Sequence, residues 1–270
     1  MRSQHLTINS KGTDYVVGDL HGCISALKQA LTIIGFNPNR DRLISVGDLV
    51  DRGYENLKAL ELLSMSWFYA VRGNHEQLHI DQDFDAATAN GMEWALTYHQ
   101  RRNLKMKLDE HDQQYFVLVG QMKQLPVLID IATPHGLVGI VHAETPHFLH
   151  NWQDVIDHAN ALTEEQITDS DLLWGRKRAS QTEMSDKPVD HRIKGVKAIL
   201  CGHTPVDQAT WIGNHLDIDT GMVFGVMGRT HLHEKPSLTL VNITDAEITR
   251  FNIRYGEVQA VTERLNLYPD

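Results

Sequence analysis

Residues 43–53 have the sequence LISVGDLVDRG, a short apolar run that ends in Gly47 and Asp48. Short apolar runs bounded by turn-forming residues are typical of buried β-strands. The same pattern, an apolar run followed at once by a polar block, recurs on both sides of this stretch. It predicts strands at residues 15–17, 43–46, 69–71, 138–141 and 198–201.

Helical patterns separate the first of these strands. Ile24, Leu27, Leu31 and Ile34 fall on one face of a helix that Gly35 would end, and leucines at 57, 60 and 63 repeat the pattern. Strand, helix and strand in succession indicate βαβ units with right-handed crossovers.

The second half of the chain favours consecutive strands, at residues 208–211, 215–219, 238–243 and 248–254, with Gly213-Asn214 as a hairpin turn. We therefore expect an α/β fold in which two mixed β-sheets pack as a central sandwich flanked by helices. We expect residues 1–270 to form a single domain. Residues 145–195 would be irregular insertions apart from a helix near 153–162, and residues 225–270 would be an extended C-terminal β region.

Composition narrows the function classes. The chain has 270 residues, a formal net charge of −10, two cysteines and no run of 18 apolar residues. We expect no membrane span, no secretory signal and no nucleic-acid partner. Two cysteines cannot staple a chain of this size, which fits a reducing, cytoplasmic environment. We also expect a monomer.

Five polar blocks follow predicted strands and carry the chemistry. They are GDLHG at 18–22, GDLVDRG at 47–53, GNHE at 73–76, VHAE at 141–144 and GHTP at 202–205. A lone Gly-Asp after a strand is more often a plain turn. Five such blocks at strand ends favour a common site, because the carboxyl ends of strands in an α/β sheet converge on one crevice.

The blocks supply two carboxylates, one amide and three imidazoles. This set of oxygen and nitrogen donors suits two divalent metal ions and needs no thiolate. The candidate ligands are Asp19, His21, Asp48, Asn74, His142 and His203.

The order of these blocks resembles that of the metal-dependent phosphoprotein phosphatases, and most closely the bacteriophage lambda type of serine/threonine phosphatase. The stretches ISVGDLVDRGYENLKALEL, WFYAVRGNHEQ, LLWGRKR and LDIDTGMVF also look like family sequence. The resemblance extends from about residue 14 to 224. It thins over 145–170 and 179–195, and the part after 224 looks extended.

The resemblance implies two metal ions that share one carboxylate, with Mn²⁺ as the expected ion and Fe or Zn as alternatives. A hydroxide bridging the ions would attack phosphorus directly, without a covalent enzyme intermediate. One ion would be held by Asp19, His21 and Asp48, and the other by Asp48, Asn74, His142 and His203.

His75 resembles the family's general acid, with Asp51 holding its imidazole. Arg52 and Arg72 would bind phosphate oxygens, because a planar guanidinium suits bidentate contact. Arg176 matches a further phosphate-binding arginine, although Arg178 is a near rival. The alternative for each arginine is a surface ion pair.

The predicted activity is hydrolysis of phosphoserine and phosphothreonine in a phosphorylated protein or peptide, with tolerance of phosphotyrosine. The first alternative is a dinucleoside polyphosphate hydrolase of the same fold, against which Asp51 argues because that branch often lacks this aspartate. The second is a non-catalytic scaffold, which would have lost ligands or the acid. The sequence leaves open whether Cys23 or Cys201 is redox-regulatory. It gives Trp94 and Trp174 no role beyond packing.

Overall fold

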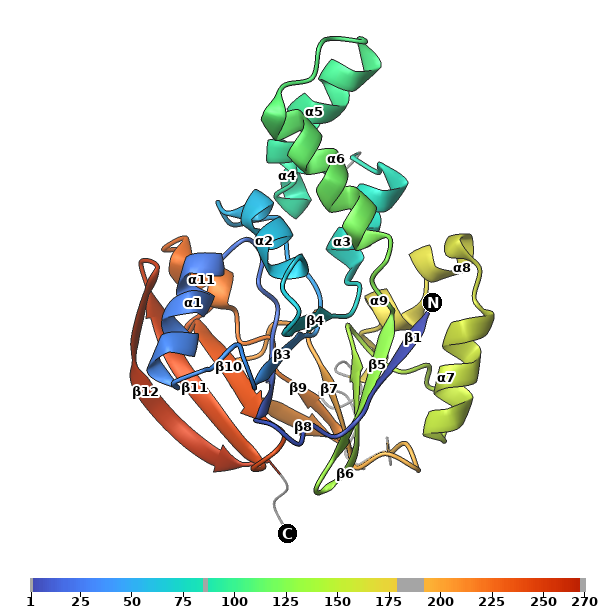
Figure 1. Cartoon of the computed structure of the whole chain (residues 1–270), viewed down its shortest axis with the longest axis vertical. Helices are drawn as coiled ribbons and strands as arrows, with labels where there is room; N and C mark the ends of the chain where they lie inside the picture. Colours follow the sequence, from blue (N-terminus) through green and yellow to red (C-terminus); the bar gives the residue numbers. More distant parts are fainter. Residues whose placement is uncertain (1, 85–86, 179–191, 268–270) are drawn as a thin grey trace.

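Two six-stranded sheets form the centre of the computed structural model, which describes residues 2–84, 87–178 and 192–267 (Figure 1). Both sheets mix parallel and antiparallel pairs. The first sheet has the order β1 (Ser3–Leu6), β5 (Leu128–Thr133), β6 (Gly136–Val141), β7 (Ala198–Cys201), β9 (His215–Asp217) and β8 (Thr210–Ile212). The second has the order β12 (Glu257–Asn266), β11 (Glu247–Arg254), β10 (Ser237–Asn242), β2 (Asp14–Val17), β3 (Arg42–Ser45) and β4 (Phe68–Ala70).

The sheets pack face to face as the predicted sandwich. Val16 of β2 and Ile44 of β3 share one buried cluster with Ile129 and Ile140 of the opposite sheet. The neighbouring residue Val17 points away from the sandwich interior into a second cluster. Because both faces of the central strands are covered, their sequences are continuous apolar runs rather than alternating ones.

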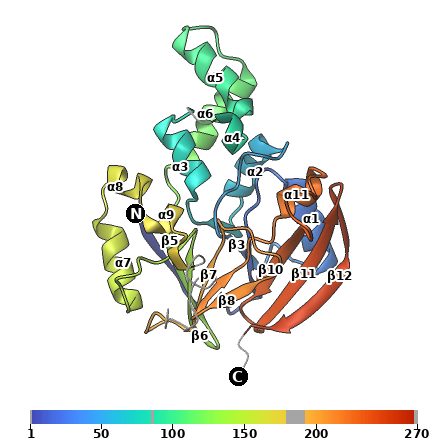
Figure 2. The same ribbon diagram turned by 180° about the vertical axis from the view of Figure 1, so that it is seen from behind.

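Helices cover both outer faces (Figures 1 and 2). Helix α1 (Ile24–Ile33) places Leu27 and Leu31 in the cluster that covers the second sheet, which confirms the periodicity predicted from the sequence. The predicted 57–63 helix is a 3₁₀ turn, η1 (Asn56–Lys58), followed by α2 (Ala59–Leu63). Helix α7 (Trp152–Ala161) covers the first sheet, close to the predicted range 153–162.

Several elements were not predicted from the sequence. Strands β1 and β5 belong to this group, and so do the short helices α8 (Glu164–Thr168), α9 (Asp171–Trp174) and α11 (Met222–Val226). Strand β12 lies within the expected C-terminal β region, although its bounds were not predicted. Helices α8 and α9 lie within the range that we expected to be irregular, of which residues 179–191 are outside the described residues. The Gly213-Asn214 turn joins β8 to β9 as predicted, with Ile212 paired to His215.

A projection of helices stands away from the sandwich (Figure 1). Helix α3 (Asn74–Asp81) leads from β4 to α4 (Ala87–Asn90), α5 (Glu93–Asn103) and α6 (Glu110–Met122). We call residues 87–122, which comprise α4, α5 and α6, the helical arm. The sequence of α5, EWALTYHQRRN, is largely polar and lacks the broad apolar stripe that marks a helix packed on a sheet. The sequence of this segment therefore does not predict a helix.

The sheet topology brings the five polar blocks together. Strands β2, β3 and β4 are parallel to one another, and so are β6 and β7. Their carboxyl ends therefore meet at one edge of the sandwich, as the sequence predicted. Within the described ranges, no helix combines the length and apolar character needed to cross a membrane.

Packing of α7 on β6 depends on the absence of a side chain at Gly139. A Cβ atom at this position would overlap the ring of Trp152, a fully buried side chain. We predict that Gly139→Ala lowers the free energy of unfolding by about 1–3 kcal/mol, because overpacking a filled core forces side chains off their rotamers. Urea denaturation measures this change.

Gly120 provides the matched control, because it lies within α6 and a Cβ there would meet no atom within 4 Å. Gly120→Ala should raise the free energy of unfolding by about 0.4–1 kcal/mol, since alanine restricts the unfolded chain. Equal effects of the two substitutions would contradict this account of the Trp152 packing.

Candidate active site

Several residues of the polar blocks have left-handed backbone conformations. A non-glycine residue in this region costs about 1–3 kcal/mol and persists only where its surroundings fix it. The concentration of such residues at the strand ends therefore indicates a functional site. They are His21 (φ 41°), Asp48 (49°), Asp51 (74°), Arg52 (64°) and His203 (71°).

Glu76 holds the Asp48 loop in place. Its Oε2 accepts the backbone N–H groups of Asp48 at 2.9 Å and Gly73 at 2.8 Å, and its Oε1 accepts that of Leu49 at 2.8 Å. Burial and the neighbouring Asp48 raise the pKa of Glu76 to about 7. The sequence analysis gave Glu76 no role, although its place three residues after Gly73 is that of a capping-box glutamate.

Two candidate ligand histidines are oriented by backbone carbonyls. His21 Nδ1 donates to Val50 O at 2.9 Å, and His142 Nδ1 donates to Val46 O at 2.8 Å. Burial lowers the pKa of both imidazoles, so both are neutral at neutral pH. Each Nε2 atom is then an unprotonated acceptor, which is the form that binds a metal ion.

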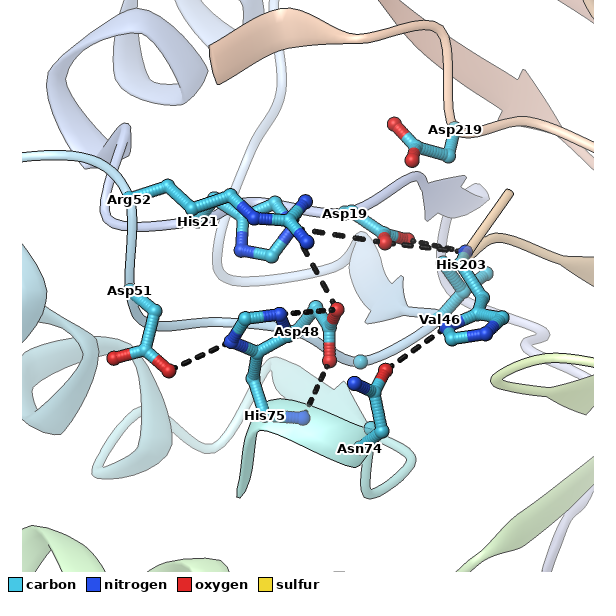
Figure 3. Close-up of polar contacts among 12 residues, drawn as sticks. Asp19, His21, Val46, Asp48, Asp51, Arg52, Asn74, His75, His203 and Asp219 are labelled. Carbon is cyan, nitrogen blue, oxygen red and sulfur yellow. Dashed lines mark hydrogen bonds and ion pairs between the residues drawn. The ribbon is translucent and has the colours of Figure 1, made fainter. Parts of the chain in front are cut away.

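Two histidine nitrogens converge on the Asn74 side chain. Its Oδ1 lies 2.8 Å from His142 Nε2. The same Oδ1 lies 2.9 Å from His203 Nδ1 (Figure 3). His142 has already used its proton on Val46, so a lone pair faces a lone pair across 2.8 Å. A cation bound between the two atoms would accept both lone pairs and remove their repulsion. Burial lowers the pKa of His203 to about 2, which leaves its imidazole neutral as well.

The second group of donors surrounds His21. Its Nε2 lies 3.5 Å from Asp48 Oδ2 and 4.0 Å from Asp19 Oδ2. The Arg52 guanidinium donates to the same Nε2 at 2.8 Å, so a positive group lies beside His21 (Figure 3). His21 Nε2 and the carboxylates of Asp48 and Asp19 therefore lie together beside a cationic group, which is an environment suited to a metal ion.

Buried carboxylates create the electrostatic demand for cations. Burial, followed by repulsion from Asp219 and Asp48, raises the pKa of Asp19 well above its ordinary value. Burial also opposes the charge of Asp48, but the surrounding imidazoles, that of His142 foremost, outweigh it and hold its pKa well below the usual range. A divalent ion beside these carboxylates would relieve the repulsion between them.

The donor atoms form two groups that share Asp48. Within each group the atoms lie within 4.8 Å of one another: one joins Asp48 to His142 and His203, and the other joins it to His21 and His75. These residues fit a two-cation centre. The second group contains His75, because its Nε2 lies 3.9 Å from Asp48 Oδ2. The sequence predicts that His75 is an acid and not a ligand.

His75 and Asp51 form a buried pair beside this centre. His75 Nδ1 donates to Asp51 Oδ2 at 2.7 Å, whereas within the described part of the chain His75 Nε2 makes no hydrogen bond and lies 3.9 Å from Asp48 Oδ2 (Figure 3). Burial lowers the pKa of His75, but Asp48 and Asp51 outweigh it and the net pKa is raised. Asp51 also accepts from His79 and Trp94, neither of which the sequence analysis selected.

The three candidate phosphate-binding arginines differ in how close they lie to the donor cluster. Arg52 lies within the donor cluster. Arg176 is exposed beside it and donates to Thr204 Oγ1 at 3.2 Å and to His203 O at 3.4 Å, whereas its rival Arg178 is buried against Thr145.

Arg72 differs from both, because the hydrogen bonds of its Nη atoms lie outside the cluster. They go to Gln77 and Glu164 and to the carbonyls of Lys123 and Leu125. Only its buried Nε has no partner among the described residues.

The two cysteines lack the features of a redox switch. Cys23 and Cys201 are both buried, and burial raises the pKa of each thiol above its ordinary value. Reactive cysteines have lowered pKa values and are accessible. Trp174, assigned to packing, stands edge-on to His203 with ring centroids 5.9 Å apart.

Asp48→Asn tests the shared ligand. The substitution removes the carboxylate that both donor groups share, so we expect the affinity for both ions to fall together. Elemental analysis of the purified variant should find less than one tightly held ion per chain.

Asp41→Asn is the matched control, since Asp41 is also buried and accepts backbone N–H groups, from Thr13 and Asn37, but takes no part in either donor group. It should keep the metal content of the unmodified protein. Two tightly held ions in the Asp48 variant would contradict the assignment.

Known proteins provide an independent comparison. The family model described as calcineurin-like phosphoesterase matches residues 15–207. Serine/threonine-protein phosphatase 1 of Salmonella typhimurium is 34% identical over 215 residues, which cover 78% of this chain and 87% of that protein. A bis(5'-nucleosyl)-tetraphosphatase, PrpE, of Geobacillus thermodenitrificans is 27% identical over 246 residues, which cover 84% of this chain and 92% of that protein.

A solved structure supports the fold. The cold-active protein-tyrosine phosphatase of a psychrophilic Shewanella species superposes with a TM-score of 0.59 at 14% identity, covering 99% of this chain and 82% of that one. The match to the family model extends over most of the chain and includes all five polar blocks. The chain therefore belongs to the calcineurin-like phosphoesterase family, and it is a metallophosphoesterase, a hydrolase.

Proposed function

We propose that the protein hydrolyses phosphoserine and phosphothreonine monoesters, and also phosphotyrosine, in phosphorylated proteins or peptides. The relatives named serine/threonine-protein phosphatase, at 34% identity over most of the chain, support this substrate class. The observation that carries the proposal is the His75 imidazole, which Asp51 holds next to a two-cation donor cluster and whose Nε2 makes no hydrogen bond among the described residues.

The metal ligands are proposed as two sets that share Asp48. One set is Asp19, His21 and Asp48, and the other is Asp48, Asn74, His142 and His203. Two divalent ions held there would supply a hydroxide nucleophile at neutral pH and would polarise the phosphoryl group. Mn²⁺ is the proposed ion, as the family resemblance implies, with Fe or Zn as the alternatives; oxygen and imidazole donors without thiolate are compatible with all three.

The chain's own residues complete the reaction. Asp51 accepts the Nδ1 proton of His75 and fixes the ring so that Nε2 points away from the carboxylate. A proton on Nε2 can then pass to the serine or threonine alkoxide as it departs. Arg52 and Arg176 would bind the phosphate oxygens, and Arg72 would contribute through its unpartnered Nε.

The remaining elements of the proposal concern the protein as a whole. We infer a monomer in which residues 1–270 form one catalytic domain and which acts in the cytoplasm. A formal net charge of −10 and two buried cysteines are compatible with this environment.

A second candidate activity is hydrolysis of dinucleoside polyphosphates. The relative named bis(5'-nucleosyl)-tetraphosphatase, at 27% identity over 84% of the chain, favours it. Purified protein with Mn²⁺ should be given a phosphoserine peptide, p-nitrophenyl phosphate and diadenosine tetraphosphate in parallel. We expect kcat/KM for the phosphoserine peptide to exceed that for diadenosine tetraphosphate, and dominant hydrolysis of the dinucleotide would reverse the ranking.

His75→Asn separates the acid from the ligands. We expect near-normal metal content and a loss of roughly 10²–10⁴-fold in turnover of the phosphoserine peptide. The loss should be much smaller with p-nitrophenyl phosphate, because p-nitrophenolate leaves with little need of a proton. Asp51→Asn should show the same dependence on the leaving group, since Asp51 acts through His75.

His203→Asn is the contrasting variant, because it removes a proposed ligand. Its metal content should fall first, and added Mn²⁺ should restore part of the activity. If His75→Asn instead lost an ion, or slowed both substrates equally, His75 would be a ligand or a structural residue, as its distance to Asp48 allows.

A further inference from the structure

The Asp51 carboxylate is saturated by side-chain donors. Its Oδ2 accepts from His75, while its Oδ1 accepts from Trp94 Nε1 at 2.7 Å and from His79 Nε2 at 2.8 Å. Asp51 is fully buried, and its pKa is lowered to about 2, because the two histidines outweigh the opposing effect of burial. The geometry of Asp51 therefore depends on groups beyond His75.

A chain of hydrogen bonds continues from His79 into the helical arm. His79 Nδ1 lies 3.0 Å from the Tyr115 hydroxyl, which lies 2.8 Å from His99 Nε2. His79 and Tyr115 are fully buried, and His99 is nearly so. The chain thus joins α3, α6 and α5 without exposure to solvent.

The contact with Asp51 fixes one proton of this chain. The Asp51 carboxylate can only accept, so His79 donates from Nε2. The Tyr115 hydroxyl bridges His79 Nδ1 and His99 Nε2, because it can donate to one ring nitrogen while its oxygen accepts from the other. In a buried chain of this kind each hydrogen bond strengthens the next.

The arm also contacts this segment through its backbone. Gly91 O accepts the N–H of Arg52 at 3.1 Å, next to Asp51 in the chain. Asp51 and Arg52 both have left-handed conformations, which need support from their surroundings. Trp94, His99 and Tyr115 all come from the arm, so its packing determines where the Asp51 carboxylate lies.

We propose that His79 and Tyr115 are positioning residues that hold Asp51, and through it the His75 imidazole, in the orientation that delivers a proton to the leaving group. This inference rests on the proposed function, in which His75 is the general acid. It assigns the helical arm a part in catalysis, because without the Tyr115 hydroxyl the His79 ring loses the partner that fixes its orientation.

Tyr115→Phe is the first test, since it removes one hydroxyl and keeps the ring. We expect kcat for a phosphoserine peptide to fall about tenfold, the rate equivalent of one ordinary hydrogen bond. With p-nitrophenyl phosphate we expect a change of less than about twofold, because this leaving group needs little protonation. Metal content should stay at that of the unmodified holoenzyme.

Tyr98→Phe is the matched control. The Tyr98 ring stacks on that of Tyr115, with centroids 5.0 Å apart, but Tyr98 takes no part in the hydrogen-bond chain. Removal of its hydroxyl should leave the ratio of the two rates unchanged. The pair therefore separates loss of the chain from general loosening of the arm.

A substitution pair at His79 keeps the test decisive if Tyr115→Phe does not fold. His79→Gln retains an N–H that can reach Asp51, whereas His79→Leu removes it. We expect His79→Leu to lower the peptide rate relative to the p-nitrophenyl phosphate rate, and His79→Gln to restore part of that ratio.

Two results would overturn the inference. One is an equal loss on both substrates in Tyr115→Phe and His79→Leu, and the other is no loss on either. His75→Asn, measured in parallel, tells the two proposals apart. If it shows the leaving-group dependence and the His79 and Tyr115 variants do not, only the positioning role is wrong; if it shows none, the acid role of His75 is wrong as well.

Discussion

The charge of Asp48 is the constraint on which the site depends. This carboxylate is buried, and the imidazoles of His21, His75 and His142 lie within 4 Å of its oxygens. Burial of a carboxylate is costly unless cations or hydrogen-bond donors surround it. Neutral histidines with unprotonated nitrogens facing the same region, together with Arg52, complete an environment suited to divalent ions.

The topology of the sandwich brings these groups together. Parallel strands end at one edge, and each of the five blocks begins where a strand stops. The tight loops that follow have strained conformations, which Glu76 stabilises at Asp48 by accepting three backbone N–H groups. The apolar core therefore contributes the rigidity that positions polar groups within hydrogen-bond distance.

The helical arm adds a second level of control at Asp51. Proton transfer depends on the direction of an imidazole, and this direction follows from the carboxylate that holds it. Asp51 receives donors from α3 and α5, and the His79 donor is itself held by Tyr115 of α6. If His75 is the general acid, as proposed, a change in the packing of the arm would affect leaving-group protonation without removing a proposed metal ligand.

The sequence alone determined strands β2 to β4 and β6 to β11, helix α1 and the polar blocks that follow the strands, because each depends on residues close together in the chain. Only the tertiary structure decided that Arg176 rather than Arg178 lies beside His203, and that Trp94 and Tyr115 support Asp51. Trp94 is 43 residues from Asp51, and Tyr115 is 36 residues from His79. Local periodicity carries no information on such pairs, since their approach depends on how whole helices pack.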